Sequence, residues 1–267
     1  MLNTCGYVVA NFQARPAMLG SADPETGSGA TGAMCFSAAA SFTVAGACAA
    51  AGVFAVLKCP APRYLPLAGI PLAFAAQQAV EGLVWLQIGQ APAATAGGLF
   101  PAIFIFFATV FWPTYVPFAI RAEEHEPDRR WTLDVLLAIG FVISLAFLSR
   151  LVSSDTVAHV EGHHVRYTAQ AAGTQTVKHW LFFKQFVTGR DWILAPYAGA
   201  VILSLFLCTL RPVRWFGAMV ALALLAVLVL DRPVLVSVWC FCAATGSVLI
   251  ALAMAQARGT KGPYRAA

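Results

Sequence analysis

The segment Ala68-Gly-Ile-Pro-Leu-Ala-Phe-Ala-Ala-Gln-Gln-Ala-Val-Glu-Gly-Leu-Val-Trp85 decides the fold class of this chain. Its length and apolar character are typical of a helix that crosses a lipid bilayer, yet it contains one carboxylic acid, Glu81. An ionisable side chain at membrane depth costs about 2.5–3.5 kcal/mol on insertion scales. We therefore expect Glu81 to face the interior of a helix bundle and to have a function there.

The composition of the whole chain points to the same class. Of its 267 residues, 60% are hydrophobic and 11% are charged, whereas soluble domains contain about 25% charged residues. A soluble fold of this length could not bury so many apolar side chains. We predict a multi-pass protein of the cell membrane, whose main partner is the lipid bilayer. Nucleic acid is not expected as a partner, because no basic run carries interleaved aromatic residues.

Seven apolar segments are expected to cross the membrane as an all-α, seven-transmembrane helix bundle. Each is bounded by charged residues, prolines or glycines, as helix ends usually are. The predicted spans are 36–57, 65–88, 98–120, 135–152, 192–210, 213–230 and 234–256. Glu81 is the one acidic residue within any of them.

Lysine and arginine gather in the loops on one side of this bundle. They are Lys58, Arg63, Arg121, Arg129, Arg130, Arg211, Arg214, Arg258, Lys261 and Arg265. Because basic residues mark the cytoplasmic loops of membrane proteins, we predict an N-terminus outside and a C-terminus inside. The long connection 153–191 is then an outer loop, although it also carries basic residues.

The membrane domain is predicted to cover residues 34–257, followed by a cytoplasmic tail, 258–267. Residues 1–33 include a run of Gly, Ser and Thr that cannot bury enough surface to fold, so we expect a disordered tail. The alternative is that the natural chain starts at Met34. In the outer loop, 157–167 alternates partly like a strand. The aromatic segment 179–186 is expected to lie as a helix at the membrane interface.

Polar groups of three spans are predicted to meet at one depth in the outer half of the bundle. The first span starts outside, the second runs outward, and the seventh runs inward, so their outer halves coincide. Phe74, Gln78, Glu81 and Trp85 form one stripe of the second helix. The seventh span contributes Ser237, Trp239 and Cys240. We predict an outward-facing pocket lined by helices 1, 2 and 7.

The predicted ligand-binding residues of this pocket are Glu81, Gln77, Gln78, Trp85, Ser37 and Trp239. Glu81 would be the charge or proton partner, the glutamines the polar lining and the tryptophans the walls. Structural roles are the alternatives. A protonated Glu81 or the glutamines could simply join helices, and the tryptophans could lie at the membrane interface.

The sequence does not identify a cofactor, and a metal ion is one candidate. Its predicted ligands are Cys35, Cys240, His163 and His164, of which the histidines belong to the outer loop on the same side of the membrane. Adjacent residues of an extended chain point to opposite faces, which makes it hard for both histidines to bind one ion. A solvated loop is the alternative for these histidines.

Several activities lack the residues that their chemistry requires. The seventh span has no lysine for the Schiff base of a retinal protein, and no zinc peptidase, serine hydrolase or Walker motif occurs. The leading hypothesis is a non-enzymatic bundle that binds a small ligand, ion or metal, as a sensor, a transporter or a subunit with partner proteins. The alternative is a membrane-embedded enzyme that acts on lipid, with Glu81 as general acid or base.

Four separated blocks of the chain resemble an uncharacterised bacterial family of multi-pass membrane proteins. They are 34–42, 64–85, 111–113 and 236–244, and family members open with the Met-Cys-Phe-Ser-Ala found here at 34–38. The resemblance implies that residues 1–33 are additional in this chain. It implies that family members share a site at the stripe residues Phe74, Gln78, Glu81 and Trp85. The resemblance implies no activity, because the family has no established one.

Overall fold

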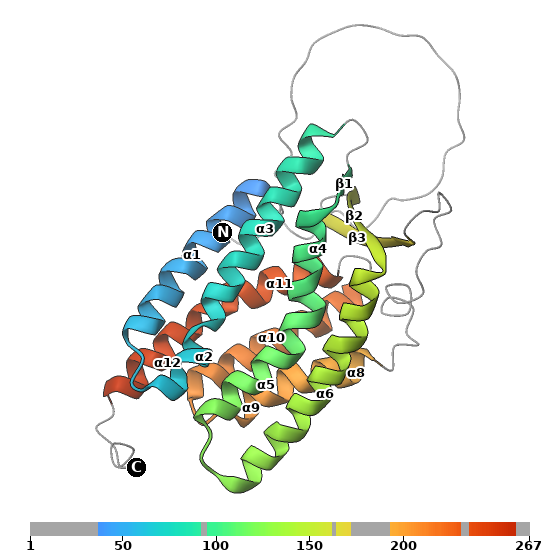
Figure 1. Cartoon of the computed structure of the whole chain (residues 1–267). Helices are drawn as coiled ribbons and strands as arrows, with labels where there is room; N and C mark the ends of the chain where they lie inside the picture. The colour runs from blue at the N-terminus through green and yellow to red at the C-terminus, as the bar shows by residue number, and fades with distance from the viewer. Residues whose placement is uncertain (1–36, 92–94, 162–163, 172–192, 231–234, 260–267) are drawn as a thin grey trace, which may run out of the picture. The chain divides into compact units, whose positions relative to one another are not determined.

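The computed structural model describes residues 37–91, 95–161, 164–171, 193–230 and 235–259 (Figure 1). It is mostly helical. Six helical segments are long and apolar enough to cross a membrane, namely Ala38–Leu57, Pro62–Gln90, Leu99–Glu123, Pro127–Val152, Arg211–Val229 and Val236–Arg258. The predicted span 192–210 contains a shorter apolar helical segment, Leu194–Leu207. The predicted tail 1–33 and the predicted interfacial helix 179–186 lie outside the described residues.

Several of these segments are built from more than one helix. The elements are α1 (Ala38–Leu57), η1 (Pro62–Tyr64), α2 (Leu65–Ala68), α3 (Ile70–Gln90), α4 (Leu99–Ile105), η2 (Phe106–Phe111), α5 (Trp112–Glu123), α6 (Pro127–Val152), α8 (Leu194–Ala198), η3 (Gly199–Leu203), α9 (Ser204–Leu207), α10 (Arg211–Leu230), α11 (Leu235–Gly246) and α12 (Val248–Gly259). Of these, η2 and η3 are π-helical.

Prolines explain the break between α4 and α5. Pro113 has no N–H, so a carbonyl one turn earlier loses its helical donor. Here the Tyr197 hydroxyl donates to the carbonyl of Ala108 at 2.6 Å. The hydroxyl of Ser144 donates to the carbonyl of Val110, also in η2. Side chains of neighbouring helices thus hydrogen-bond to backbone carbonyls of the π-helix η2, which is how irregular helices are stabilised in a membrane.

Pro117 also lacks an N–H, so the carbonyl of Pro113, one turn earlier, has no helical hydrogen-bond donor. That carbonyl lies against Gly140 of α6, where a Cβ atom would stand 1.8 Å from its oxygen. Only glycine fits such a close approach of two helix backbones. The contact sets the distance between α5 and α6.

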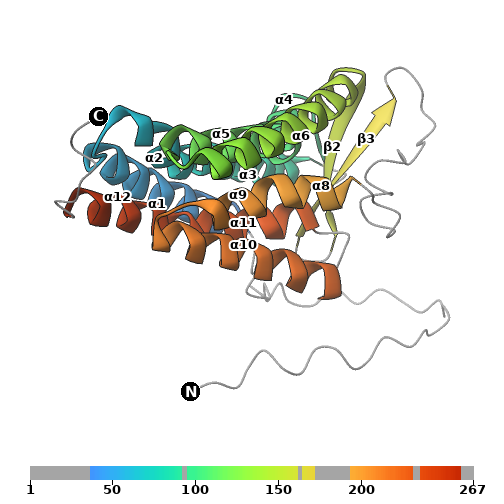
Figure 2. The same cartoon turned by 90° about the horizontal axis from the view of Figure 1, so that it is seen from below.

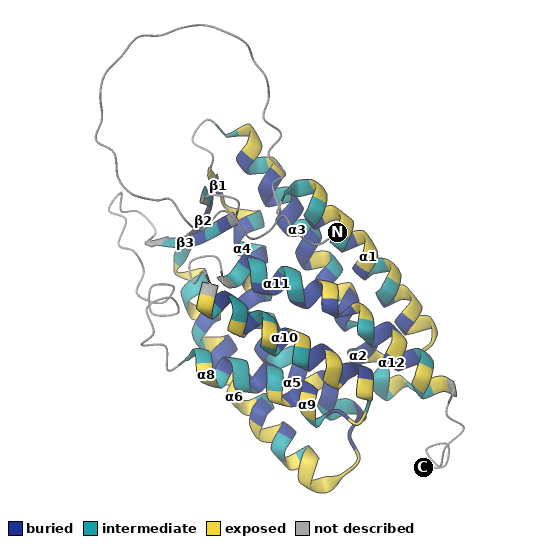
Figure 3. Cartoon of the chain, turned by 180° about the vertical axis from the view of Figure 1, so that it is seen from behind, coloured by how far each residue is buried: buried dark blue, intermediate teal, exposed yellow. Residues whose placement is uncertain are grey.

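The described helices are apolar both inside and outside. The interior contains large side chains that are fully buried, such as Phe104, Phe216 and Met254. Large apolar side chains are also exposed along the outward faces of α1, α6 and α10 (Figure 3). An outer surface of this kind is suited to lipid rather than water.

A three-stranded antiparallel sheet covers one end of the helices (Figures 1 and 2). Its strands are β1 (Thr95–Gly97), β2 (Ser154–Glu161) and β3 (His164–Ala171), in the order β1-β2-β3. The strand-like pattern predicted at 157–167 falls on two paired strands, β2 and β3, rather than on one, and β1 was not expected. We call this the sheet end. The opposite end carries the connections 58–61, 124–126 and 208–210.

Gly140 provides a test of the packing between α5 and α6. We expect Gly140→Ala to lower the apparent melting temperature by several degrees, because overpacking costs about 1–3 kcal/mol. Gly46→Ala is the matched control, since nothing lies within 4 Å of a Cβ atom there. Thermal unfolding of the two variants in the same detergent compares them. Equal melting temperatures would show that α5 and α6 do not approach as described.

Candidate functional site

Glu81 lies on α3 toward the sheet end, and only 1% of its surface is exposed. Its Oε1 accepts a hydrogen bond from the hydroxyl of Ser237 on α11. Its Oε2 accepts one from Gln78 Nε2 at 3.0 Å. The sequence predicted that Ser237 and Glu81 share one depth, and the structure brings them into direct contact.

Gln77 joins the same helix to α5. Its Oε1 accepts a hydrogen bond of 2.7 Å from Trp112 Nε1, at the first residue of α5 after the π-helix. Gln77 and Gln78 are both completely buried. The polar stripe of α3 therefore contacts two other helical segments, at Ser237 and at Trp112.

Tyr167 of β3 brings the sheet into the site, which sequence reasoning missed. Its ring stacks on that of Phe104, with centroids 4.7 Å apart. Burial raises the pKa of Tyr167 well above its ordinary value, and the nearby Glu81 and Cys240 raise it further. The phenol is therefore protonated at neutral pH and offers an O–H donor. The available signal was its two-residue spacing from Val165, which is also buried.

Three polar atoms around Glu81 are buried and lack a hydrogen-bond partner among the described residues. They are Gln77 Nε2, Gln78 Oε1 and Tyr167 Oη. The thiol of Cys240 lies near Gln77. Nearly all buried polar groups in proteins are paired, so each unpaired one calls for a partner. Arg63 Nε, Gln87 Oε1, Glu123 Oε2 and Glu124 Oε2 are also buried without a partner among the described residues.

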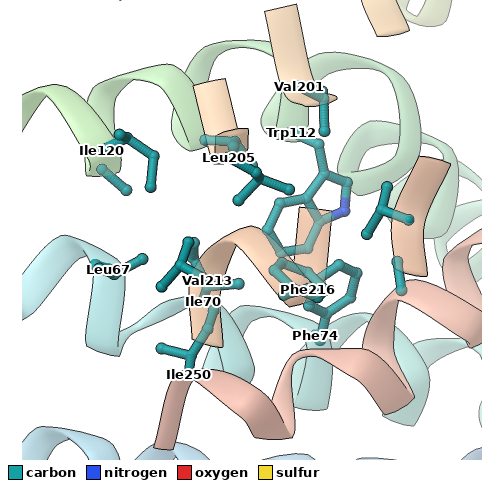
Figure 4. Packing of buried hydrophobic residues seen from close by; sticks show 14 of the residues in the cluster. Leu67, Ile70, Phe74, Trp112, Ile120, Val201, Leu205, Val213, Phe216 and Ile250 are labelled. Carbon is teal, nitrogen blue, oxygen red and sulfur yellow. The ribbon is translucent and has the colours of Figure 1, made fainter. Parts of the chain in front are cut away.

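An apolar cavity of about 30 Å³ lies near these side chains. Trp112, which donates to Gln77, and Cys240, which lies near Gln77, line it, whereas Glu81, Gln77, Gln78 and Tyr167 do not (Figure 4 shows Trp112 above Phe74). The wall is largely aromatic, and the rings of Phe74 and Trp112 stack with centroids 4.0 Å apart. The residues that line the cavity are Phe74, Trp112, Val116, Tyr197, Val201, Leu205, Phe216, Val220, Trp239, Cys240 and Ala243.

The remaining predicted ligand-binding residues have different surroundings. Trp239 lines the cavity, and its Nε1 donates to the carbonyl of Val220 at 3.0 Å. Trp85 is buried and packs in the cluster beneath the sheet. Ser37 caps α1, and its Oγ accepts a hydrogen bond from the N–H of Ala40 at 3.2 Å. A ligand-binding role stays a prediction for all six residues, Glu81, Gln77, Gln78, Trp85, Ser37 and Trp239.

The predicted metal ligands are only partly described. Cys35 and His163 lie outside the described residues, His164 begins β3, and Cys240 is buried at the cavity. Within the described residues, no group of three or more His, Cys, Asp or Glu side chains could hold a metal ion. The four-residue metal set stays a prediction.

A second buried carboxyl group, Glu123, lies at the opposite end of the bundle. Its Oε1 accepts a hydrogen bond of 2.7 Å from the thiol of Cys208. Sequence reasoning missed it because the predicted span ended at residue 120. The available signal was helical spacing, since Glu123 continues the buried face that includes Val116 and Ile120.

Comparison with known proteins shows the family of the chain but not its activity. A family model described as a family of unknown function, DUF6629, matches residues 34–265, and the chain belongs to this family. Neither the curated proteins nor the solved structures contain a match. The resemblance inferred from the four sequence blocks is thus confirmed as far as an uncharacterised family.

Substitution of Glu81 tests whether its carboxyl group joins α3 to α11. Glu81→Leu leaves the Ser237 hydroxyl and Gln78 Nε2 without their acceptor, and we expect the apparent melting temperature to fall by several degrees. Glu81→Gln keeps one acceptor oxygen and should cost less. The control is Glu126→Leu, at an exposed connection. If Glu81→Leu unfolded together with this control in a detergent melt, the described contact would be wrong.

Proposed function

We propose that this protein is a multi-pass membrane protein that binds a small ligand in the Glu81 site, as a sensor, a transporter or a subunit of a membrane complex. One observation carries the proposal. A buried carboxyl group lies among side chains with three buried polar atoms that lack a partner in the described residues, and Trp112 and Cys240 of the same region line an apolar cavity.

The energetic cost of this arrangement argues against a purely structural role. Each unpaired buried polar group lowers the stability of the fold by about 1–3 kcal/mol, whereas an apolar side chain of similar size carries no such penalty. Hydrogen bonds between membrane helices recover only about 0.6 kcal/mol on average. A cluster of such groups is expected where a bound molecule supplies the missing partners.

The two π-helices support the same location. Val201 of η3 lines the cavity, and Trp112, which also lines it, follows η2 directly. Stretches of π-helix are rare and often occur at functional sites, because they displace side chains from regular helical positions. Here they put aromatic and apolar groups beside the polar stripe of α3.

We further propose seven spans, with the sheet end outside. The segment Leu194–Leu207 would be the seventh crossing, although it is shorter than the about 20 residues of a typical span. The charge distribution supports this orientation. In the described residues, Lys58, Arg63, Arg121, Arg129, Arg130, Arg211, Arg214 and Arg258 lie toward the opposite end, whereas Arg150 and Arg166 lie at the sheet end. The Glu81 site then lies in the outer half of the bundle.

Reporter insertions test the orientation. A reporter inserted at Gly162, between β2 and β3, should be accessible from outside the cell. The same reporter at the exposed Glu126, between α5 and α6, should be accessible only from the cytoplasm. Protease protection in intact cells and in inverted vesicles reads both positions. Accessibility from one and the same side would exclude the proposed topology.

The ligand-binding proposal is tested by mass spectrometry of molecules that co-purify with the protein in mild detergent. We expect wild type to retain a small molecule that Glu81→Gln loses in large part, because the amide cannot exchange a proton and is a weaker acceptor. Glu126→Gln serves as the control. Retention of the same molecule by Glu81→Gln as by wild type would remove Glu81 from the site.

A further inference from the structure

We infer that the buried apolar cavity is a binding site for an apolar diatomic gas, of which dioxygen is the member that most cells consume. This inference goes beyond the proposed function. It concerns the cavity alone and needs neither Glu81 nor the unpaired polar atoms of its neighbours.

The strong side-chain donors of the cavity wall are already occupied. Trp112 Nε1 donates to Gln77 at 2.7 Å, and Gln77 does not line the cavity. The Tyr197 hydroxyl donates at 2.6 Å and Trp239 Nε1 at 3.0 Å, both to backbone carbonyls of the helices. The thiol of Cys240 is a weak donor and lies near Gln77. A ligand that needs hydrogen bonds from the wall therefore finds no suitable donor.

The rest of the wall consists of apolar side chains, and this excludes most kinds of ligand. An ion would leave its hydration shell without gaining a partner of opposite charge. A buried water usually makes about three hydrogen bonds, and apolar cavities stay dry. The ligand that fits is uncharged and has no hydrogen-bonding group.

The size of the cavity restricts the ligand further. Its volume is about 30 Å³, whereas a site for one water takes about 10–15 Å³ and a site for benzene about 150 Å³. The cavity thus has room for about two small atoms and not for a ring or an acyl chain. All the residues that line it are buried. A diatomic molecule fits this space and can reach it through fluctuations of side chains.

Fixed aromatic rings keep the cavity from collapsing. Phe74 stacks on Trp112 with centroids 4.0 Å apart and meets Phe216 edge-on at 6.4 Å. Tyr197 and Trp239 meet edge-on at 5.7 Å. Because hydrogen bonds hold three of these rings, the wall cannot relax into the void, and a persistent void lowers stability. A small apolar molecule restores the missing dispersion contacts, and the hydrocarbon of the bilayer concentrates such molecules.

Methyl NMR under gas pressure tests this inference. The full-length protein, labelled with ¹³C at valine and leucine methyl groups, is placed in nanodiscs under dioxygen or, as the diamagnetic reference, dinitrogen. Because dioxygen is paramagnetic, methyl groups at the cavity should relax several-fold faster than that of Val213, which is fully buried on α10 away from the cavity. This excess should level off as pressure rises. The methyl groups at the cavity are those of Val116, Val201, Leu205 and Val220.

Two variants that fill the cavity connect the effect to this site. Ala243→Val adds two methyl groups to the wall, so the excess relaxation at Leu205 should fall to the level of Val213. Val116→Ile adds a methyl group from a different helix and should act in the same direction. Ala47→Val, at an exposed position of α1, should behave like wild type. Melting temperatures show that each variant is folded.

Three results would overturn the inference. The cavity methyl groups could relax no faster than that of Val213, or their excess could rise linearly with pressure, as for gas that merely dissolves in the bundle. The excess could also persist in both filled variants. None of these results depends on a molecule that co-purifies through Glu81, so the inference and the proposed function are tested separately.

Discussion

A carboxyl group within an apolar bundle has no water to solvate it, and the arrangement of the sheet end follows from this constraint. Glu81 obtains its hydrogen bonds from Gln78 on its own helix and from Ser237 on α11. The second bond requires α3 and α11 to approach at one height. The neighbouring Gln77 extends the polar contacts to Trp112 of α5, so one stripe of α3 organises the helices around it.

The same constraint acts on the backbone. Prolines within α5 and before it remove N–H groups, and in lipid the freed carbonyls need other partners. Tyr197 supplies one, at Ala108, and the side chains of Ser144 and Tyr115 donate to the backbone carbonyls of Val110 and Pro66, the latter at 3.0 Å. The irregular helices are thus stabilised by specific side chains of their neighbours. The π-helices lie beside the cavity because Trp112, which directly follows η2, and Val201 of η3 both line it.

Local patterns in the sequence predicted much of the fold. Of the seven spans predicted from hydropathy, six correspond to helices long and apolar enough to cross a membrane, and 192–210 contains the shorter Leu194–Leu207. Opposite chain directions predicted that Glu81 and Ser237 share one depth, and the two side chains are in contact. What these patterns could not predict depends on contacts distant in sequence. The insertion of Tyr167 beside Glu81 requires the hairpin to fold over the helix ends, and β1 forms only by pairing with β2. Glu123 was missed because hydropathy ends a span at the first charges, whereas the helix and its buried face continue.

The junction between α6 and the sheet is very short, since α6 ends at Val152 and β2 begins at Ser154. The carbonyl of Arg150 accepts hydrogen bonds from Ser153 and from the Ser154 hydroxyl, which hold the turn. On the side of α6 the hairpin therefore has no linker, and its first strand continues directly from a helix of the bundle. Exchanging or deleting the hairpin would take Tyr167 away from Glu81, so the loop and the helices have to be inherited and engineered as one unit.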